Sequence, residues 1–243
     1  MDVLVVGAGA VGRWFASLAD APVSFADVEE ARAEAAAAEH DGRARAVPLD
    51  GEESFGLVAV AVPMSAAADA IAAHAERAER AVVDFTGEMR GPLAAMASAA
   101  PARERASFHP LFAPEHAPGR VAVSESTAGP AVERVREWLD AAGNTLVDVA
   151  PADHDDAMAT IQGRAHAAVL AFALAADDVP DELATPVYED LAALVARVTG
   201  GNPRVYADIQ DAFGGTEELA AAARRLADAD REAFLEAYED AGR

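Results

Sequence analysis

The chain has no cysteine and no lysine, and each absence excludes some chemistry. Without cysteine there are no disulfides and no thiolate ligands for a metal. Without lysine no Schiff base can form with a carbonyl substrate, and no dehydrogenase mechanism can use a lysine as its proton shuttle. The 6 histidines form no tight cluster with carboxylates, so we expect no metal site.

Long apolar runs and basic stripes are also missing. No stretch of about 18 apolar residues is free of charge, and the first predicted strand begins at once, so we expect neither a membrane span nor a signal peptide. All 19 basic residues are arginine, and 42 acidic residues give the chain a net charge of −23. A chain of this charge with no basic stripe is a poor partner for nucleic acid.

The acidic residues are spread along every segment, and alanine dominates the predicted helices. This composition is typical of cytoplasmic proteins of extreme halophiles, archaea among them. Their carboxylates keep the surface hydrated in molar salt, where the Debye length is only about 3 Å. The alternative is a mesophilic protein whose composition follows a GC-rich codon bias.

The most specific motif lies within the first twelve residues. The apolar run Val3–Val6 leads into Gly7-Ala8-Gly9-Ala10-Val11-Gly12, a G-x-G-x-x-G turn followed by helical sequence. The first glycine permits the turn, the second lets the backbone approach a pyrophosphate, and the third lets helix and strand pack closely. The motif predicts a dinucleotide site, and the alternative is a glycine-rich turn without a ligand.

Asp27 narrows the choice of cofactor. It ends the second apolar stretch, about 20 residues after Gly7, where an acid binds the ribose hydroxyls of NAD and repels the extra phosphate of NADP. We therefore predict NAD as the cofactor. The predicted cofactor-binding residues are Gly7, Gly9, Ala10, Val11, Gly12, Asp27, Val62 and Pro63.

The pattern of elements divides the chain into two parts. Residues 1–150 alternate between strands and helices, which predicts an α/β fold with an N-terminal Rossmann-type, doubly wound sheet. The predicted strands are 3–6, 23–26, 57–62, 81–84, 105–108, 120–124 and 145–149, and the predicted helices are 11–18, 29–40, 66–77, 92–99 and 130–142. Residues 151–243 predict a C-terminal all-helical domain, with helices at 154–176, 185–199, 209–213, 217–228 and 231–241.

His109 is the candidate base. It follows a predicted strand, and Pro110 biases it toward extended backbone. A histidine at a strand end near the nicotinamide can accept a proton. The alternative is an ordinary loop histidine.

Candidate substrate contacts lie on the predicted helices of the second part, facing a cleft between the domains. At 100° per residue Asp155, Gln162 and His166 share one face of the helix 154–176. Beside that face runs an apolar stripe of Met158, Ile161, Ala165 and Phe172. The alternative for Gln162 and His166 is a helix–helix hydrogen bond. Arg197 lies off the apolar face of its helix, so periodicity favours a surface arginine, although its guanidinium suits a carboxylate.

Four further segments, taken with the glycine turn, resemble the prephenate dehydrogenase (TyrA) family. Residues 84–93, DFTGEMRGPL, resemble the loop after its fourth core strand, and 109–114, HPLFAP, resemble its HPMFGP motif. Residues 154–166 are similar to its HD…M…IQ…H helix, and 202–209, NPRVYADI, to its (D/N)P-x-LYADI segment.

The resemblance implies NAD(P)-linked oxidative decarboxylation of prephenate, or of its amino analogue arogenate, on the route to tyrosine. It also implies a homodimer formed through the helical domain. His109 matches the catalytic histidine that accepts the ring-hydroxyl proton, Arg197 the carboxylate-binding arginine, and Gln162 and His166 the polar positions of the cleft helix.

The loop 84–93 departs from the family. That loop often reads D-x-x-S-x-K, but Gly87 stands at the serine position and Met89 at the lysine position. Thr86 is the candidate to replace the serine hydroxyl, and Arg90 the candidate to replace the lysine charge. The alternatives to a prephenate dehydrogenase are another nicotinamide-dependent reductase of this architecture and a non-catalytic NAD-sensing regulatory protein.

Overall fold

The computed structural model describes residues 1–40 and 42–243. These residues form two compact units, Met1–Asp155 and Asp156–Arg243. The division falls inside helix α6 (Pro151–Met158), whereas the sequence predicts a boundary between residues 150 and 151. His154 and Asp155 belong to the first unit because their side chains bond to its strands and helices.

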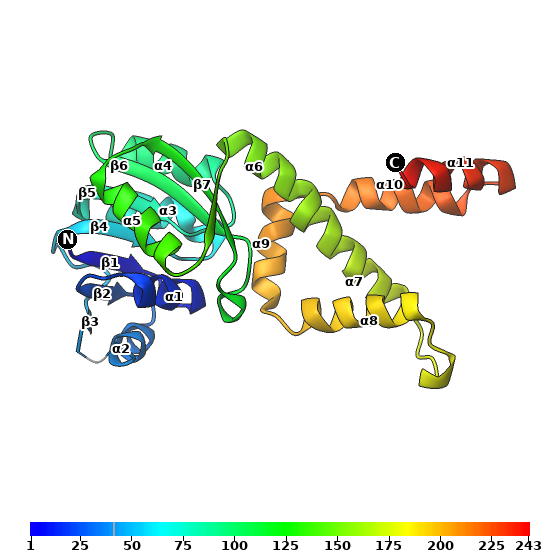
Figure 1. Cartoon of the computed structure of the whole chain (residues 1–243), viewed down its shortest axis with the longest axis horizontal. Helices are drawn as coiled ribbons and strands as arrows, with labels where there is room; N and C mark the ends of the chain where they lie inside the picture. Colours follow the sequence, from blue (N-terminus) through cyan, green and yellow to red (C-terminus); the bar gives the residue numbers. More distant parts are fainter. Residues whose placement is uncertain (41) are drawn as a thin grey trace. The chain divides into compact units, whose positions relative to one another are not determined.

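The first unit contains an eight-stranded sheet with the order β3-β2-β1-β4-β5-β6-β7-β8 (Figure 1). The strands are β1 (Val3–Val6), β2 (Val23–Ala26), β3 (Ala44–Ala46), β4 (Phe55–Val60), β5 (Ala78–Asp84), β6 (Glu104–Pro110), β7 (Arg120–Thr127) and β8 (Thr145–Asp148). Neighbours are parallel except β6 and β7. The predicted doubly wound sheet is confirmed, and β3 is an additional edge strand whose Ala-Arg-Ala sequence gives no strand signal.

Helices cover both faces of this sheet, so alternate residues of β1 point into two cores. Val3 and Val5 pack with α1 (Ala10–Leu18), α2 (Glu30–Ala38) and α5 (Pro130–Ala141). Leu4 and Val6 pack with α3 (Met64–His74) and α4 (Arg90–Ala99). Two short 3-10 turns, η1 (Ala75–Arg77) and η2 (Pro114–His116), complete the unit.

The strand order places the site at the edge of the sheet formed by the carboxyl ends of its central strands. The chain leaves β1 and β4 toward opposite faces, which makes the carboxyl ends of these neighbours the topological switch point of the sheet. Parallel strands β5 and β6 end at the same edge. Gly7, Val62, Thr86 and His109 therefore lie at the edge where ligands bind in open α/β sheets.

The second unit is helical throughout its described residues, as predicted. After α6 come η3 (Ala159–Arg164), α7 (Ala165–Ala175), η4 (Asp181–Leu183), α8 (Pro186–Thr199), α9 (Pro203–Phe213), α10 (Thr216–Ala227) and α11 (Arg231–Ala241). α9 begins six residues before the predicted start, at Pro203 rather than Ile209. Asn202 caps it, since its side-chain oxygen accepts from the N–H of Arg204 at 3.1 Å.

The helix predicted at 154–176 is interrupted by a π-helical turn, η3. A π-helical turn holds more residues than an α-turn, so it shifts the faces of the helix that follows. Asp155 bonds within the first unit, whereas Gln162 and His166 belong to the second. The predicted apolar stripe is wrong at Ile161, which is 59% exposed, and at Ala165, which is also exposed, although Met158 is buried.

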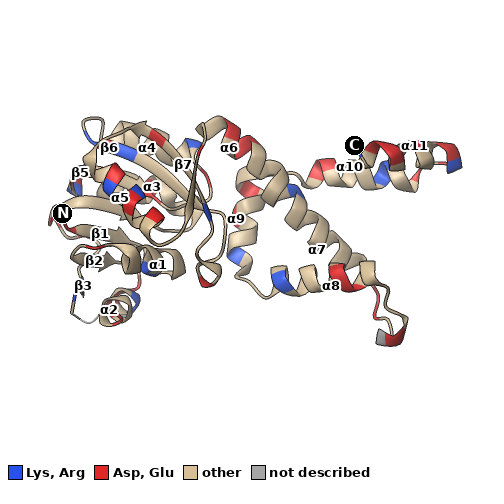
Figure 2. Cartoon of the chain, in the orientation of Figure 1, with Lys and Arg blue, Asp and Glu red and all other residues tan. Residues whose placement is uncertain are grey.

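Acidic side chains lie on elements throughout both units (Figure 2). Among the described residues, no helix has the length and apolarity required to cross a membrane.

Candidate functional site

The glycine turn has the geometry that a dinucleotide requires. Gly7 has a φ of 102°, and a Cβ built there would lie 2.3 Å from the carbonyl oxygen of Ala61. A Cβ at Gly12 would lie 2.0 Å from the carbonyl oxygen of Gly7, so helix α1 could not approach the turn with any side chain there. At Gly9 a Cβ would meet nothing within 4 Å, which leaves this backbone open to a ligand.

Helix α1 and Asp27 complete this part of the site. The N–H groups of Ala10, Val11 and Gly12 lie in the first turn of α1, where the helix supplies no acceptor for them and its dipole favours an anion. Asp27 accepts from the N–H of Ala8 at 2.8 Å and from the N–H of Glu29 at 2.9 Å. Its carboxylate is thus fixed beside the turn, and these residues fit a pyrophosphate and an adjacent ribose.

Asp84 ends β5 as a fully buried carboxyl group. Thr86 donates to it twice, from its hydroxyl at 2.5 Å and from its N–H at 3.0 Å. Burial raises the pKa of Asp84 to about 7, although the groups of Thr86 and the hydroxyl of Ser107 act in the opposite direction. The Thr86 hydroxyl, predicted to contact substrate, is therefore bonded to a carboxyl group in this structure.

The side chain of Met64 lies close beside Gly87. A Cβ built on Gly87 would lie 2.7 Å from the sulfur of Met64, at the start of α3. The Met64 side chain fills the volume that a serine side chain would enter.

His109 lies inside β6 rather than after it, because Pro110 still pairs with Val121 of the antiparallel neighbour β7. Its ring is buried, and Nδ1 lies 2.9 Å from Nε2 of His154 on α6. The two rings meet edge to face with centroids 5.1 Å apart. His154 Nδ1 in turn lies 2.7 Å from Oδ1 of Asp155.

Burial, and after it the neighbouring His154, lower the pKa of His109 to about 3, while Asp155 acts in the opposite direction. His109 is therefore neutral at physiological pH and has a ring nitrogen able to accept a proton. Although burial raises it, the pKa of Asp155 is lowered overall by hydrogen bonds from His154 and from the backbone of Arg90 and Met89.

His154 and Asp155 were not among the predicted site residues. Two signals point to them: they open the HD…M…IQ…H segment, and they are an adjacent histidine and acid at the start of a helix. The helical period predicts that Asp155 shares a face with Gln162, and Gln162 lies in the π-helical turn that begins at Ala159. Among the described residues, no group of three or more histidine and acidic side chains has an arrangement that could hold a metal.

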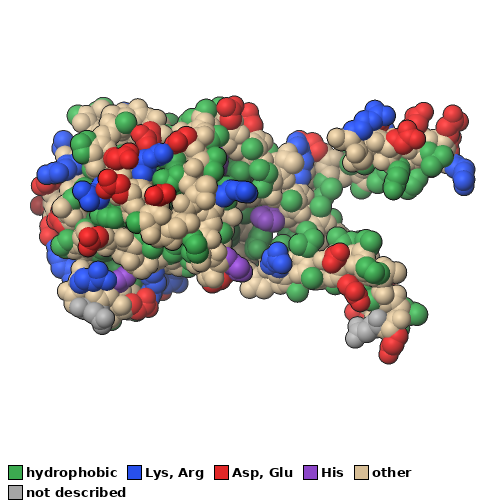
Figure 3. Space-filling view, in the orientation of Figure 1, with side chains coloured by type: hydrophobic (Ala, Val, Ile, Leu, Met, Phe, Trp, Pro, Cys, Tyr) green, Lys and Arg blue, Asp and Glu red, His purple; other side chains and the backbone are tan. Residues whose placement is uncertain are grey.

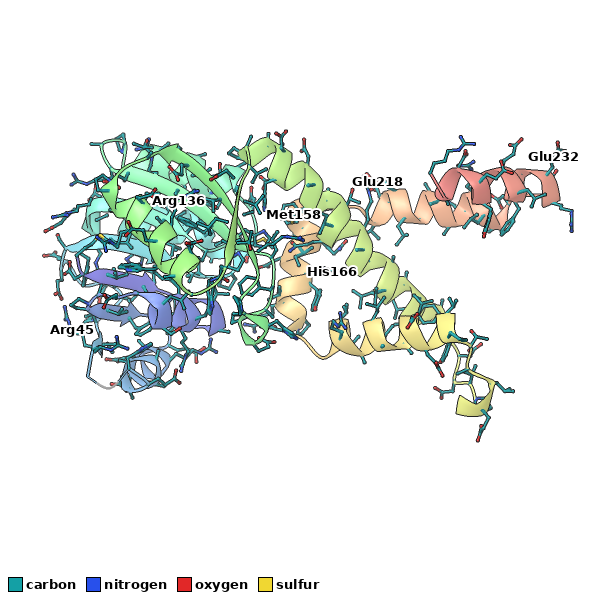
Figure 4. The ribbon with its side chains drawn as sticks, in the orientation of Figure 1. Arg45, Arg136, Met158, His166, Glu218 and Glu232 are labelled. Carbon is teal, nitrogen blue, oxygen red and sulfur yellow. The ribbon has the colours of Figure 1, made fainter. Side chains whose placement is uncertain are left out.

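The other predicted substrate residues lie in the second unit. His166 lies in the first turn of α7 (Figure 4). Its ring is edge-on to Tyr206 of α9, with the ring centroids 5.0 Å apart. Burial lowers its pKa, and its buried Nδ1 has no hydrogen-bond partner among the described residues. Gln162 lies half-buried in η3, and Arg197 lies exposed in the last turn of α8.

The chain is similar in sequence to dehydrogenases of cyclohexadienyl compounds. The family "Prephenate dehydrogenase, dimerization domain" matches residues 150–236. The 4-amino-4-deoxyprephenate dehydrogenase of Streptomyces pristinaespiralis is 34% identical over 234 residues, which cover 88% of this chain and 77% of that protein. A probable arogenate/prephenate dehydrogenase of Methanocaldococcus jannaschii is 29% identical over 83 residues, 32% of this chain and 19% of that protein.

Solved structures share the fold at low sequence identity. Prephenate dehydrogenase from A. aeolicus, in complex with hydroxyphenyl propionate and NAD⁺, has a TM-score of 0.75 at 14% identity, covering 98% of this chain and 92% of that one. Synechocystis arogenate dehydrogenase has a TM-score of 0.66 at 17% identity, covering 94% and 90%. At these identities the likeness shows a common fold.

Proposed function

The chain belongs to the prephenate dehydrogenase family of oxidoreductases, and we propose that it uses NAD to convert prephenate to 4-hydroxyphenylpyruvate in tyrosine biosynthesis. The observation that carries this proposal is the buried, neutral His109 at the carboxyl end of β6. It stands at the same sheet edge as the glycine turn, where a base is needed beside a nicotinamide.

His109 moves the proton of the substrate. As the ring carbon that bears the hydroxyl loses hydride, this hydroxyl becomes strongly acidic and its proton passes to the neutral imidazole. The ring then loses CO₂ and becomes aromatic, and the proton returns to the same oxygen. A base that is neutral before the reaction and charged during it contributes by general base catalysis.

Gly7, Gly9 and Gly12 would hold NAD with the N–H groups of Ala10 and Val11, and Asp27 would bind the ribose. When bound, NAD⁺ accepts the hydride. The predicted contacts of Val62 and Pro63 are supported by their place after β4, beside the Gly7 turn. The Gly7–Ala61 approach and the open backbone at Gly9 support the fit.

Arg197, His166 and Gln162 are proposed to bind the substrate, which is a dianion. A chain of net charge −23 must offer a local cation to a carboxylate, and Arg197 is the candidate. A charge-assisted hydrogen bond of this kind contributes about 1.5–3 kcal/mol. The unpartnered Nδ1 of His166 supports a polar ligand in the second unit, because buried polar atoms are normally hydrogen-bonded.

The second unit is proposed to form a homodimer. Large apolar side chains are exposed on its helices, among them Leu174, Val187 and Tyr238. An apolar surface of this kind marks an interaction site. A second copy of the chain is the partner that the matched family description names.

Substrate and cofactor are tested together in one assay. Prephenate, arogenate and 4-amino-4-deoxyprephenate are each supplied with NAD⁺ and with NADP⁺, and the reduced cofactor is followed by absorbance. The expected result is fastest turnover with prephenate and NAD⁺. Fastest turnover with arogenate would establish the alternative substrate, and 4-amino-4-deoxyprephenate is included because of the Streptomyces relative.

No turnover with any of the three would overturn the proposal. Tight NAD binding without turnover would favour a regulatory protein, and preference for NADP⁺ would contradict the role of Asp27. The assay is run in molar KCl, and loss of activity at low KCl is expected of the cytoplasmic, halophilic protein that the composition indicates.

A further inference from the structure

A chain of hydrogen bonds, called the His109 chain below, runs from the start of α4 through Asp155 and His154 to His109. It begins at the N-terminus of the helix, passes through Asp155 and His154 of α6, and ends on Nδ1 of His109. All three side chains are buried. The groups that hold them all belong to one unit.

Asp155 is the fixed end of the His109 chain. Its Oδ1 accepts from the N–H of Met89 at 3.0 Å and its Oδ2 from the N–H of Arg90 at 3.0 Å. Met89 is the N-cap residue of α4 and makes no side-chain cap, while the nearby Glu88 accepts from the N–H of Gly91 at 3.1 Å. Asp155 thus caps a helix 65 residues away in the sequence, and the helix dipole favours its ionised form.

An ionised carboxylate has only acceptors, so Asp155 fixes the proton on the ring nitrogen of His154 that faces it. His154 Nδ1 must carry a hydrogen, because it faces Asp155. A doubly protonated His154 would donate from both ring nitrogens, whereas a singly protonated His154 has a lone pair on Nε2 and accepts from Nδ1–H of His109. In the second arrangement the remaining ring nitrogen of His109, Nε2, is the one that carries a lone pair.

We propose that His154 and Asp155 are positioning residues that hold His109 in the Nδ1–H tautomer, with Nε2 as the proton acceptor. The catalytic part of this inference rests on the proposed function, and the tautomer does not. When Nε2 takes a proton, the imidazolium of His109 is stabilised by the negative charge of Asp155 through the intervening ring. The same logic operates where an acid orients the histidine of a hydrolase triad.

Two substitutions of His154 separate its two hydrogen bonds. In His154→Asn the side-chain NH₂ can replace Nδ1 and still donate to Asp155, but nothing reaches His109. In His154→Gln the side-chain oxygen can replace Nε2 and still accept from His109. We expect kcat to fall about 100-fold in His154→Asn and less than about 10-fold in His154→Gln.

Asp155→Asn and Asp153→Asn are the second matched pair. The amide in Asp155→Asn would have one acceptor oxygen for the two backbone N–H groups at the start of α4 and for His154 Nδ1–H. If its NH₂ turns toward His154, both histidines change tautomer, and His109 then carries its hydrogen on Nε2. We expect kcat to fall about 100-fold or more in Asp155→Asn with little change in KM. Asp153 is exposed in the first turn of the same helix, and Asp153→Asn is expected to retain activity.

The tautomer is measured directly by ¹⁵N NMR of the histidine rings in the full chain, without substrate or cofactor. His109 is expected as Nδ1–H in the wild type and in His154→Gln, and as Nε2–H in His154→Asn and Asp155→Asn. Thermal unfolding verifies that each variant is folded, and His154→Gln remains informative if Asp155→Asn does not fold.

An Nε2–H tautomer of His109 in the wild type would overturn the proposal. The proposal would also be overturned if His109 had the same tautomer in His154→Asn and His154→Gln and the two variants had equal kcat values. If no cyclohexadienyl substrate is turned over, the proposed function fails, and the NMR result still decides the proton assignment.

Discussion

The two units differ in how completely they bury their apolar side chains. In the first, every residue of β1 and β4 is buried between helices on both faces of the sheet. In the second, the buried apolar side chains among the described residues are Met158, Ala167, Val198, Ile209 and Ala237. Leu174 is 89% exposed and Tyr238 is 72% exposed in the same unit.

The difference in burial suits the first unit to hold a rigid site and the second to bind another surface. A sheet covered on both faces has a core of its own. This core supports the glycine turn and the hydrogen bonds that join His109, His154 and Asp155. Helices that leave large apolar side chains in water need another surface to cover them. Figure 3 shows hydrophobic side chains along α10 and α11, which pair through Arg225 and Asp240 at 2.9 Å.

The largest effect is expected from removing the base in the first unit. His109→Asn should lower kcat about 100-fold or more, because the proposed acceptor of the hydroxyl proton is removed. NAD binding and the oligomeric state should be unchanged, since neither needs the imidazole. Steady-state kinetics and size-exclusion chromatography test this. His116→Asn, at an exposed histidine, is the control, and comparable kcat values for the two variants would contradict the assignment.

Charges placed on the apolar face of α11 should disrupt the proposed dimer while leaving the fold of the first unit unchanged. Phe234 and Tyr238 lie four residues apart and therefore share a helix face, and they are 47% and 72% exposed. Phe234→Glu with Tyr238→Glu should convert the proposed dimer to a monomer, because carboxylates are costly to bury. Light scattering measures the mass. Glu232→Gln is the control, and a dimer that survives the double substitution would move the interface elsewhere.

Arg197→Ala should weaken substrate binding without affecting the cofactor. Loss of one charge-assisted contact is expected to raise KM for prephenate about 10- to 100-fold. The NAD dissociation constant, followed by tryptophan fluorescence, should stay constant. Arg204→Ala, at an exposed arginine of α9, provides the comparison. An unchanged KM would return Arg197 to the surface role that helical periodicity favours.

The smallest effect concerns the stability of the first unit alone. The folded state keeps the proton of Asp84 up to about pH 7, whereas the unfolded chain loses it near the ordinary pKa of 3.8. The protonated carboxyl therefore contributes stability at low pH, and this contribution is lost as pH rises through 7. Asn cannot ionise, so Asp84→Asn escapes this loss.

Between about pH 5 and 8 the free energy of unfolding of Asp84→Asn should rise relative to that of the wild type by about 1–3 kcal/mol. Both tryptophans, Trp14 and Trp138, lie in the first unit, so their fluorescence follows its unfolding. The contribution of His109, whose lowered pKa weakens the folded state below about pH 6.5, is the same in both proteins. Parallel pH profiles would show that Asp84 is ionised when folded.

The strands and the glycine turn were predictable because their signals are local. Val3–Val6, Val23–Ala26 and Arg231–Ala241 have the predicted bounds. The edge strand β3 was missed because it pairs only with β2 and carries no apolar run. The extension of β6 through His109 was missed because an antiparallel neighbour, and not the sequence of β6, continues the ladder.

The sequence by itself determined the doubly wound sheet, the helical second unit and the dinucleotide turn. Each depends on periodicity or on backbone freedom within a few consecutive residues. Only the tertiary structure decided the environment of His109. Its partner is 45 residues away in the sequence, and the acid behind that partner caps a helix in yet another part of the chain. No local sequence pattern predicts these contacts, because the packing of α6 and α4 at the end of the sheet brings the residues together.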